Sequence, residues 1–227
     1  RLTPNQNLAI RWVKESDLFE VYRNLLSIRL GNPGSCSIAS SVGCSGTTSC
    51  NLAITNSHRL AKEIQAKMLE LKFDLDLGLK NSTIKVSGCP NSCGQHEIAT
   101  LGFYGGASRV NGAQAPTYQM FMGGHGGSDT SLGTLLMKVP AKRIIDVILK
   151  TIEFYRKTKL ENEGLDQWTD RIVRGEGPDG AKNLQELKDH LEPIAAVPSI
   201  EVDPDAYVDL GNEVKFRTKT AKGECAA

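Results

Sequence analysis

Several features that mark other protein classes are missing from this 227-residue sequence. It has no run of 18 apolar residues, so no helix is expected to span a membrane, and no charged-then-apolar signal segment opens it. Its formal net charge is only +1, so no overall field favours nucleic acid or an acidic membrane surface. The glycine-rich stretch at residues 123–127 lacks the lysine and the spacing of a phosphate-binding loop, which argues against that role.

Cysteine is scarce as well, with six residues, yet four of them form two close pairs. Cys44 and Cys50 have five residues between them, and Cys89 and Cys93 have three. Deprotonated sulfur is a soft, anionic ligand that suits iron–sulfur clusters or zinc. Glycines flank both pairs, let the backbone approach an inorganic core and leave N–H groups free to donate to sulfur. These glycines are Gly43, Gly46, Gly88 and Gly94.

Three alternatives compete with a single iron–sulfur centre. Two disulfides are disfavoured because no secretory signal is recognisable and a chain of this length needs no disulfides to stabilise its fold. A structural zinc site usually has tighter spacings than the one between Cys44 and Cys50. Unrelated buried cysteines would not be expected to cluster with Gly, Pro and Asn. The remaining thiols are not expected to be ligands, because Cys36 lies outside both pairs and Cys225 lies in a polar tail.

The two pairs and their surroundings resemble the siroheme and 4Fe-4S signature of the sulfite and nitrite reductase family. The resemblance rests on C-x5-C within residues 43–54 and on C-x3-C within residues 87–95, where spacing and flanking residues match together. The opening residues 1–8 and the later residues 101–103 are also similar to that family. The similarity covers about residues 1–190, and Ser45 departs from it where many relatives carry Pro or Thr.

The resemblance implies an α+β fold, with a mixed sheet and packed helices. It implies a partial ferredoxin-like half-repeat at residues 1–34, whose partner half is missing here. A 4Fe-4S and siroheme-binding domain would follow at residues 35–192, and an extended C-terminal tail at residues 193–227. Because the first residue is Arg rather than Met, we expect the chain to be the C-terminal half of a longer protein.

The resemblance also implies which residues bind the cofactors. Cys44, Cys50, Cys89 and Cys93 would hold the 4Fe-4S cluster, and Cys93 would also be the axial ligand of the siroheme iron. Gln6 and Asn91 would contact the siroheme. The distal basic residues that bind substrate would come from the missing half, so none is carried over and this fragment alone is expected to be inactive.

The implied reaction is the six-electron reduction of sulfite to sulfide, or of nitrite to ammonia, with sulfite slightly favoured. The expected partners are the N-terminal half of the same polypeptide, an electron donor (ferredoxin or a flavoprotein) and a small inorganic anion, but neither nucleic acid nor membrane. Available thiolates and the absence of an export signal predict a cytoplasmic location. An iron–sulfur electron carrier without catalysis and a zinc-binding structural module are the alternatives.

Periodicity predicts the secondary structure. Strands are expected at residues 6–13, 82–87, 97–104 and 117–122, and helices at 16–29, 51–73, 140–157, 164–174 and 181–191. A Gly- and Ala-rich turn at residues 105–115 and the loop at residues 123–127 would let the backbone approach a flat cofactor. Asn56 or Ser57 is expected to cap the second helix. His58, His96 and His125 are expected to lie near the surface or the site without binding metal.

Overall fold

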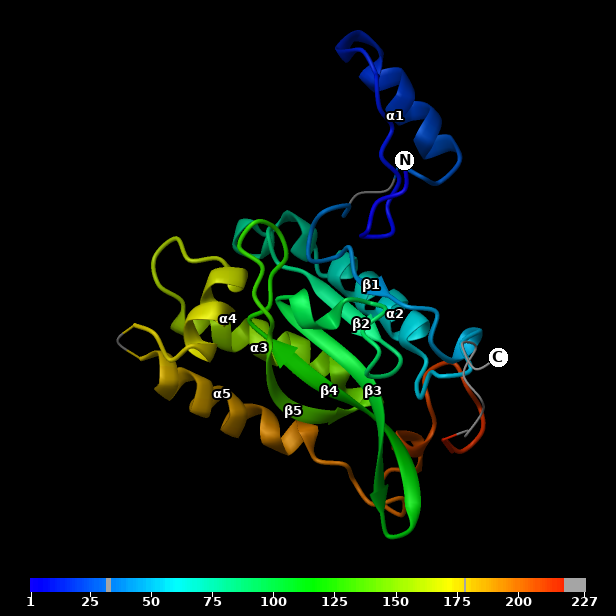
Figure 1. The fold of residues 1–227 in the computed structure, drawn as a ribbon, viewed down its shortest axis with the longest axis vertical. Coiled ribbons are helices and arrows are strands. Elements are labelled where there is room, and N and C mark those ends of the chain that lie inside the picture. Colours follow the sequence, from blue (N-terminus) through cyan, green and yellow to red (C-terminus); the bar gives the residue numbers. More distant parts are fainter. Residues whose placement is uncertain (32–33, 178, 219–227) are drawn as a thin grey trace.

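The fold centres on a five-stranded mixed sheet, with strand order β1-β2-β3-β4-β5 (Figure 1). The structure is a computed structural model that describes residues 1–31, 34–177 and 179–218. The first three strands pair in parallel and the last three pair antiparallel, which confirms the α+β class with a mixed sheet. The strands are β1 (Val42–Gly43), β2 (Ile84–Ser87), β3 (Leu101–Val110), β4 (Ala113–Met122) and β5 (Thr134–Pro140).

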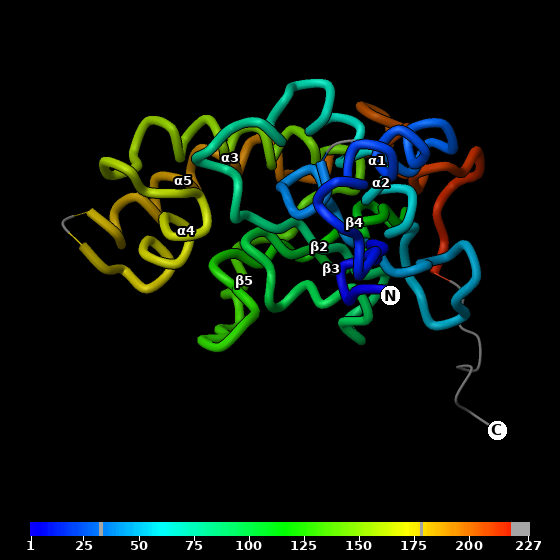
Figure 2. The backbone as a smooth tube through the Cα atoms, turned by 90° about the horizontal axis from the view of Figure 1, so that it is seen from above, coloured from blue at the N-terminus to red at the C-terminus, as the bar shows by residue number. Residues whose placement is uncertain are grey.

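Helices cover one face of this sheet. Figure 2 shows α2 and α3 along one side of the strands, and the core between the layers joins side chains of α2, α3, α4 and α5 to those of β2, β3, β4 and β5. Apolar positions that recur every three or four residues explain this packing, because they give each helix one apolar stripe. The α-helices of the described residues are α1 (Leu18–Ser27), α2 (Ser57–Glu70), α3 (Ile144–Thr158), α4 (Leu165–Val173) and α5 (Gly180–Ala195).

The opposite face of the sheet has a different character. Successive strand residues point to opposite faces, so Lys85 and Ser87 lie opposite the core residues Ile84 and Val86. On this second face the His96 ring packs 5.1 Å from the ring of Tyr104 and 5.3 Å from that of Phe121, measured between centroids. This second face therefore carries polar and aromatic side chains beside the second cysteine pair.

The N-terminal segment departs from expectation in one respect. The helix predicted at residues 16–29 is present as α1, and Figure 1 shows it standing apart from the sheet. None of its residues is buried. The strand predicted at residues 6–13 is wrong, because Gln6 and Trp12 have φ angles of 60° and 64°, which interrupt an extended chain. A single bridge between Leu2 and Leu8 replaces it.

Two further predictions are corrected by tertiary contacts. The helix expected at residues 51–73 begins only at Ser57, because the N–H groups of Ile54 and Thr55 donate to the carbonyl of Gly88 instead of to a helical turn. The long turn expected at residues 105–115 is wrong, since β3 and β4 continue through it. The turn itself is Asn111-Gly112, where both residues have positive φ, as a two-residue hairpin turn of type I′ requires.

The segment that follows α5 returns to the sheet and to α2. Tyr207 and Phe216 are both buried, and Tyr207 packs with Ala115 of β4. The Asp209 carboxylate accepts a hydrogen bond of 2.8 Å from the backbone N–H of Asn56, the N-cap residue of α2. Residues 199–216 thus connect the start of α2 to the hairpin. Cys225 lies outside the described residues.

No described helix is both long enough and apolar enough to cross a bilayer.

Candidate functional site

Parallel pairing of β1 and β2 brings the two cysteine loops to one edge of the sheet. Cys44 follows β1 directly and Cys89 follows β2 after one glycine, and the carboxyl ends of parallel neighbours meet at the same edge. The backbone N–H of Cys44 donates to the carbonyl of Val86 at 3.1 Å, which extends the pairing beyond the strand. The backbone pairing of β1 and β2 therefore already places the two cysteine loops next to each other.

The first loop is compact. A single 3-10 turn (Gly46–Thr48) follows Cys44, and the N–H of Cys50 donates to the carbonyl of Gly46 at 3.0 Å. Gly46 has a φ of 55°, and a Cβ there would lie 2.7 Å from the backbone nitrogen of Ser57. A side chain at this position would therefore collide with the first turn of α2, so the loop needs glycine to bring Cys44 and Cys50 together.

Direct hydrogen bonds join the two loops. The N–H of Gly88 donates to the Sγ atom of Cys44 at 3.1 Å, and the Gly88 carbonyl accepts from the N–H groups of Ile54 and Thr55 at 2.8 and 3.1 Å. This confirms the expectation that a flanking glycine leaves its N–H for a cysteine sulfur. An N–H aimed at sulfur stabilises the anionic thiolate, which is the form that binds metal.

The four paired cysteines interact electrostatically. Burial raises the pKa of the Cys89 thiol, and the other three cysteines of the two pairs raise it further. All five described cysteines are free thiols, which does not support the disulfide alternative. In the chain as described, however, no three Cys, His, Asp or Glu side chains already stand in a metal-binding arrangement. The structure thus brings the thiols into one region without closing them around a common point.

The fit to an iron–sulfur cluster rests on this donor set. Soft sulfur ligands, a backbone N–H directed at one of them and glycines where the loops meet are the features that such a cluster needs. The sulfurs also differ in exposure, because Cys89 is buried whereas Cys93 is exposed. Only an exposed sulfur can contact a second, larger group from outside the loops.

A buried serine supports the second loop. Ser87 Oγ accepts a hydrogen bond from the N–H of Gly94 at 3.1 Å and lies 3.0 Å from His96 Nδ1. Because its oxygen accepts from Gly94, its own proton is available to the histidine nitrogen. His96 is buried, and burial lowers its pKa, so the ring favours the neutral form. Ser87 and His96 therefore fix the turn that follows Cys93.

Gly105 of β3 lies against the backbone that leads into Cys89. A Cβ at this position would overlap Thr55 Oγ1 and would lie 2.6 Å from the carbonyl oxygen of Gly88. The glycines of residues 105–115 were expected to admit a flat cofactor. At Gly105 the close neighbour is instead the backbone that leads into Cys89.

The other expected site residues lie as follows. Gln6 is exposed, and its Nε2 donates to the carbonyl of Gly43 at 2.9 Å, directly before Cys44. Asn91 is exposed in the second loop. Cys36 is exposed and lies outside both loops, and His58 is exposed in the first turn of α2. The exposed positions of Cys36 and His58 agree with surface roles for both residues.

Sequence reasoning missed Lys85, a buried lysine in β2. Together with Gln95 and His125 it lines a cavity of about 720 Å³, which residues of α4 also line. His125 thus lies in a loop, as expected, but also faces a cavity. Side chains alternate between the two faces of a strand, so the predicted strand 82–87 already placed Lys85 on the face opposite Ile84 and Val86. This alternation was the signal in the sequence that could have identified Lys85.

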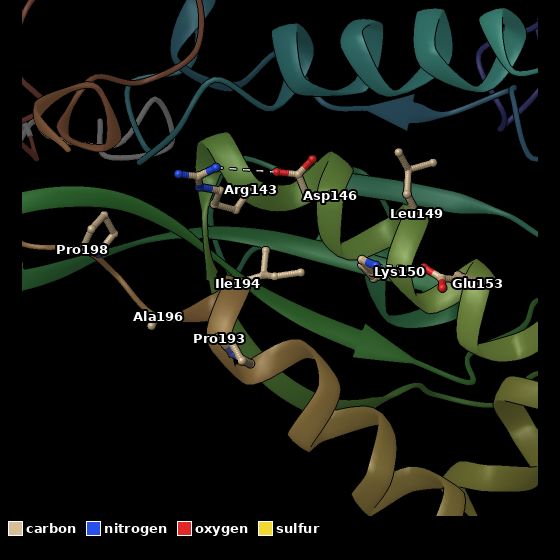
Figure 3. Close-up of a pocket in the computed structure, with 9 residues that line it drawn as sticks. All are labelled: Arg143, Asp146, Leu149, Lys150, Glu153, Pro193, Ile194, Ala196 and Pro198. Atoms are coloured by element: carbon tan, nitrogen blue, oxygen red, sulfur yellow. Dashed lines mark hydrogen bonds and ion pairs between the residues drawn. The ribbon is translucent and has the colours of Figure 1, made fainter. Parts of the chain in front are cut away.

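A second cavity, of about 540 Å³, lies on the helix side (Figure 3). Its charged lining comes from α3 and from the N-cap residue Arg143, and these charges form ion pairs with one another. Arg143 lies 3.8 Å from Asp146, and Lys150 lies 2.9 Å from Glu153. Apolar residues at the end of α5 form the opposite wall, among them Pro193 and Ile194. None of the cysteines lines this cavity, and its charges already neutralise one another.

Comparison with known proteins agrees with the geometry. A family model described as the nitrite and sulphite reductase 4Fe-4S domain matches residues 35–173. A "Sulfite reductase [ferredoxin]" from Mycobacterium tuberculosis is 28% identical over 186 residues, which are 79% of this chain and 32% of that protein. A "Ferredoxin--nitrite reductase" from Synechococcus elongatus is 31% identical over 137 residues, which are 60% of this chain and 26% of that protein.

The solved structure of the NirA protein of Mycobacterium tuberculosis is similar as well. It matches with a TM-score of 0.64 and 26% sequence identity, covering 81% of this chain and 33% of that one. The chain therefore spans about a third of the length of the relatives it matches. Because the family model covers more than half of the chain, and includes both cysteine pairs, the chain belongs to the nitrite and sulphite reductase family, in the part that carries the 4Fe-4S domain.

Proposed function

We propose that Cys44, Cys50, Cys89 and Cys93 hold a 4Fe-4S cluster that serves the reduction of an inorganic anion. The observation that carries the proposal is the hydrogen bond from the Gly88 N–H to Cys44 Sγ, which joins the two loops at a sulfur atom. Backbone donors of this kind raise the reduction potential of a cluster, because they stabilise the extra negative charge of the reduced form.

Within this proposal Cys93 has a second role, as the axial sulfur of siroheme. Its exposure supports the assignment, since the sulfur of Cys89 is buried. Gln6 and Asn91 would line the same cofactor, and both are exposed near the loops. When bound, siroheme would supply the iron at which the anion is reduced, and Cys93 would be a ligand to both this iron and the cluster.

The chain's own residues would position this thiolate and protect it. Ser87 and His96 fix the turn after Cys93, and the first turn of α2 covers the inner side of the first loop, where Cys44 Sγ lies 3.1 Å from Ser57 Oγ. Rigid placement of this kind matters for electron transfer between neighbouring metal centres, because a misplaced sulfur would weaken their contact.

The reaction proposed is the six-electron reduction of sulfite to sulfide or of nitrite to ammonia. The relatives include both sulfite and nitrite reductases. Their names also give two electron sources, because the two relatives above are named for ferredoxin, whereas a "Sulfite reductase [NADPH] hemoprotein beta-component" from Staphylococcus carnosus, 29% identical over 177 residues, is named for NADPH. We accordingly propose a one-electron donor protein and a further part of the enzyme that binds the anion. Sulfite is the slightly favoured substrate.

Absorption spectroscopy tests the shared sulfur. The chain is loaded anaerobically with iron, sulfide and siroheme, and is compared with Cys93→Ser and with Cys36→Ser as the matched control. We expect siroheme bands and cluster absorption in the wild type and in Cys36→Ser, and the disturbance of both in Cys93→Ser. Normal siroheme bands in Cys93→Ser would show that this sulfur is not the axial ligand.

A further inference from the structure

Lys85 is a buried cation that has no counterion among the described residues. Only 6% of the residue's surface is exposed, and its Nζ donates to Gln95 Oε1 at 2.8 Å. Among the residues that the structure describes, no carboxylate forms an ion pair with it. Burial lowers its pKa, in keeping with the energetic cost of removing an unpaired ammonium group from water.

Two hydroxyl groups beside Lys85 also have protons to donate. The N–H of Thr83 donates to Thr100 Oγ1 at 3.0 Å, and the N–H of Thr100 donates to Thr83 Oγ1 at 3.2 Å. Since each oxygen accepts from the backbone, each hydroxyl proton is left for another acceptor. Both threonines line the same cavity of about 720 Å³ as Lys85 and Gln95. The lining of this cavity therefore includes an ammonium group and two hydroxyl donors.

Two carboxylates also line this cavity. Asp166 and Asp170 of α4 line it, and Asp170 is already paired with Arg174 at 2.9 Å. Neither carboxylate forms an ion pair with Lys85 in the described chain. An anionic group bound beside Lys85 would supply the counterion that the described residues do not provide.

We propose that Lys85 binds an oxyanion in this cavity, either a carboxylate group of siroheme or a free inorganic anion. Its position supports both sources. Gln95, the partner of Lys85, belongs to the turn after Cys93, in which the Gln95 N–H donates to the carbonyl of Ser92 at 2.7 Å. The siroheme source rests on the proposed function, whereas the inorganic source does not.

Two variants and one control test the proposal. Lys85→Met removes the charge at similar volume, and Gln95→Glu gives Lys85 an internal counterion at an exposed position. Lys80→Met, at an exposed lysine shortly before β2, is the matched control. The unfolding midpoint of each variant is measured first, so that Gln95→Glu still tests the site if Lys85→Met fails to fold.

In the first arm, inorganic phosphate is titrated calorimetrically into the siroheme-free chain. We expect binding to the wild type and to Lys80→Met, and binding about tenfold weaker or more in Lys85→Met and Gln95→Glu, because a charge-assisted hydrogen bond is lost. In the second arm, siroheme binding to the same proteins is followed by absorption. Displacement of phosphate by siroheme, with weaker siroheme binding in Lys85→Met, identifies a cofactor carboxylate as the occupant.

Phosphate binding that persists in the siroheme-loaded protein identifies a free anion instead. Equal affinities of the wild type and Lys85→Met for both phosphate and siroheme overturn the proposal. If siroheme binds to no variant, the proposed function fails, but the phosphate arm still decides whether Lys85 binds an oxyanion.

Discussion

The N–H of Gly88 donates to the Sγ atom of Cys44 across 3.1 Å, which joins two loops that lie far apart in the sequence. The contact exists because β1 and β2 are parallel neighbours, so that both loops leave the sheet at one edge. It links fold and proposed chemistry directly, since the same backbone group that connects the loops also stabilises a thiolate.

Gly105→Ala should disturb this junction. The new Cβ would overlap Thr55 Oγ1 and press on the Gly88 carbonyl, so we expect the free energy of unfolding to fall by about 1–3 kcal/mol. Gly106→Ala is the matched control, because the nearest atom to its Cβ is Thr117 Oγ1 at 3.9 Å. Urea unfolding of both variants measures the difference. Equal stabilities would show that the strand absorbs the methyl group and that Gly105 is not required there.

Ser87→Ala should loosen the turn after Cys93. The buried N–H of Gly94 would lose its acceptor and His96 its partner, which we expect to cost about 1–3 kcal/mol of unfolding free energy. Ser82→Ala provides the control, since Ser82 Oγ is buried without a hydrogen-bond partner, and its removal should be close to neutral. A Ser87→Ala variant as stable as Ser82→Ala would contradict the positioning role.

Asp209 should make stability depend on pH in a defined direction. Burial raises its pKa above the ordinary value of 3.8, so the folded chain binds this proton more tightly than the unfolded chain. The contribution of Asp209 is therefore fully present below pH 3.8 and decreases as the pH rises through the higher folded pKa. Urea unfolding over a pH series, for the wild type and Asp209→Asn, measures it.

In that series the unfolding free energy of the wild type, relative to Asp209→Asn, should fall as the pH rises from about 4 and then level off. An increase of the difference with pH would mean that the hydrogen bonds from Asn56 and Leu210 outweigh burial and lower the pKa.

The sequence predicted the meeting of the two cysteine loops and the helix α3 for clear physical reasons. Soft ligands at characteristic spacing, flanked by glycine, are an unusual local pattern, and the apolar face of residues 140–157 is wide enough to identify a helix, found as α3. The N-cap role of Asn56 was likewise predictable, because its side chain accepts from the Arg59 N–H only two residues into the helix.

The misses have a common cause in non-local contacts. The Gly88 carbonyl takes the N–H groups that residues 54 and 55 would need for a helix. The glycines after β3 appeared to mark a long turn, although the Asn111-Gly112 pair alone is the hairpin signal and the strands continue around it. Lys85 and Ser87 gain their importance from the cavity and from Gly94, which no spacing in the sequence reveals.

The most direct test of the proposed metal centre is the iron and sulfide content of the anaerobically reconstituted chain. We expect about four iron and four sulfide per chain in the wild type and in Cys36→Ser, with the cluster absorption of a cubane. Cys44→Ser, Cys50→Ser, Cys89→Ser and Cys93→Ser should each lose most of this iron or most of the cluster's stability. Full loading of any one of these four variants, with unchanged cluster absorption, would contradict the assignment of that cysteine and of the four-sulfur centre.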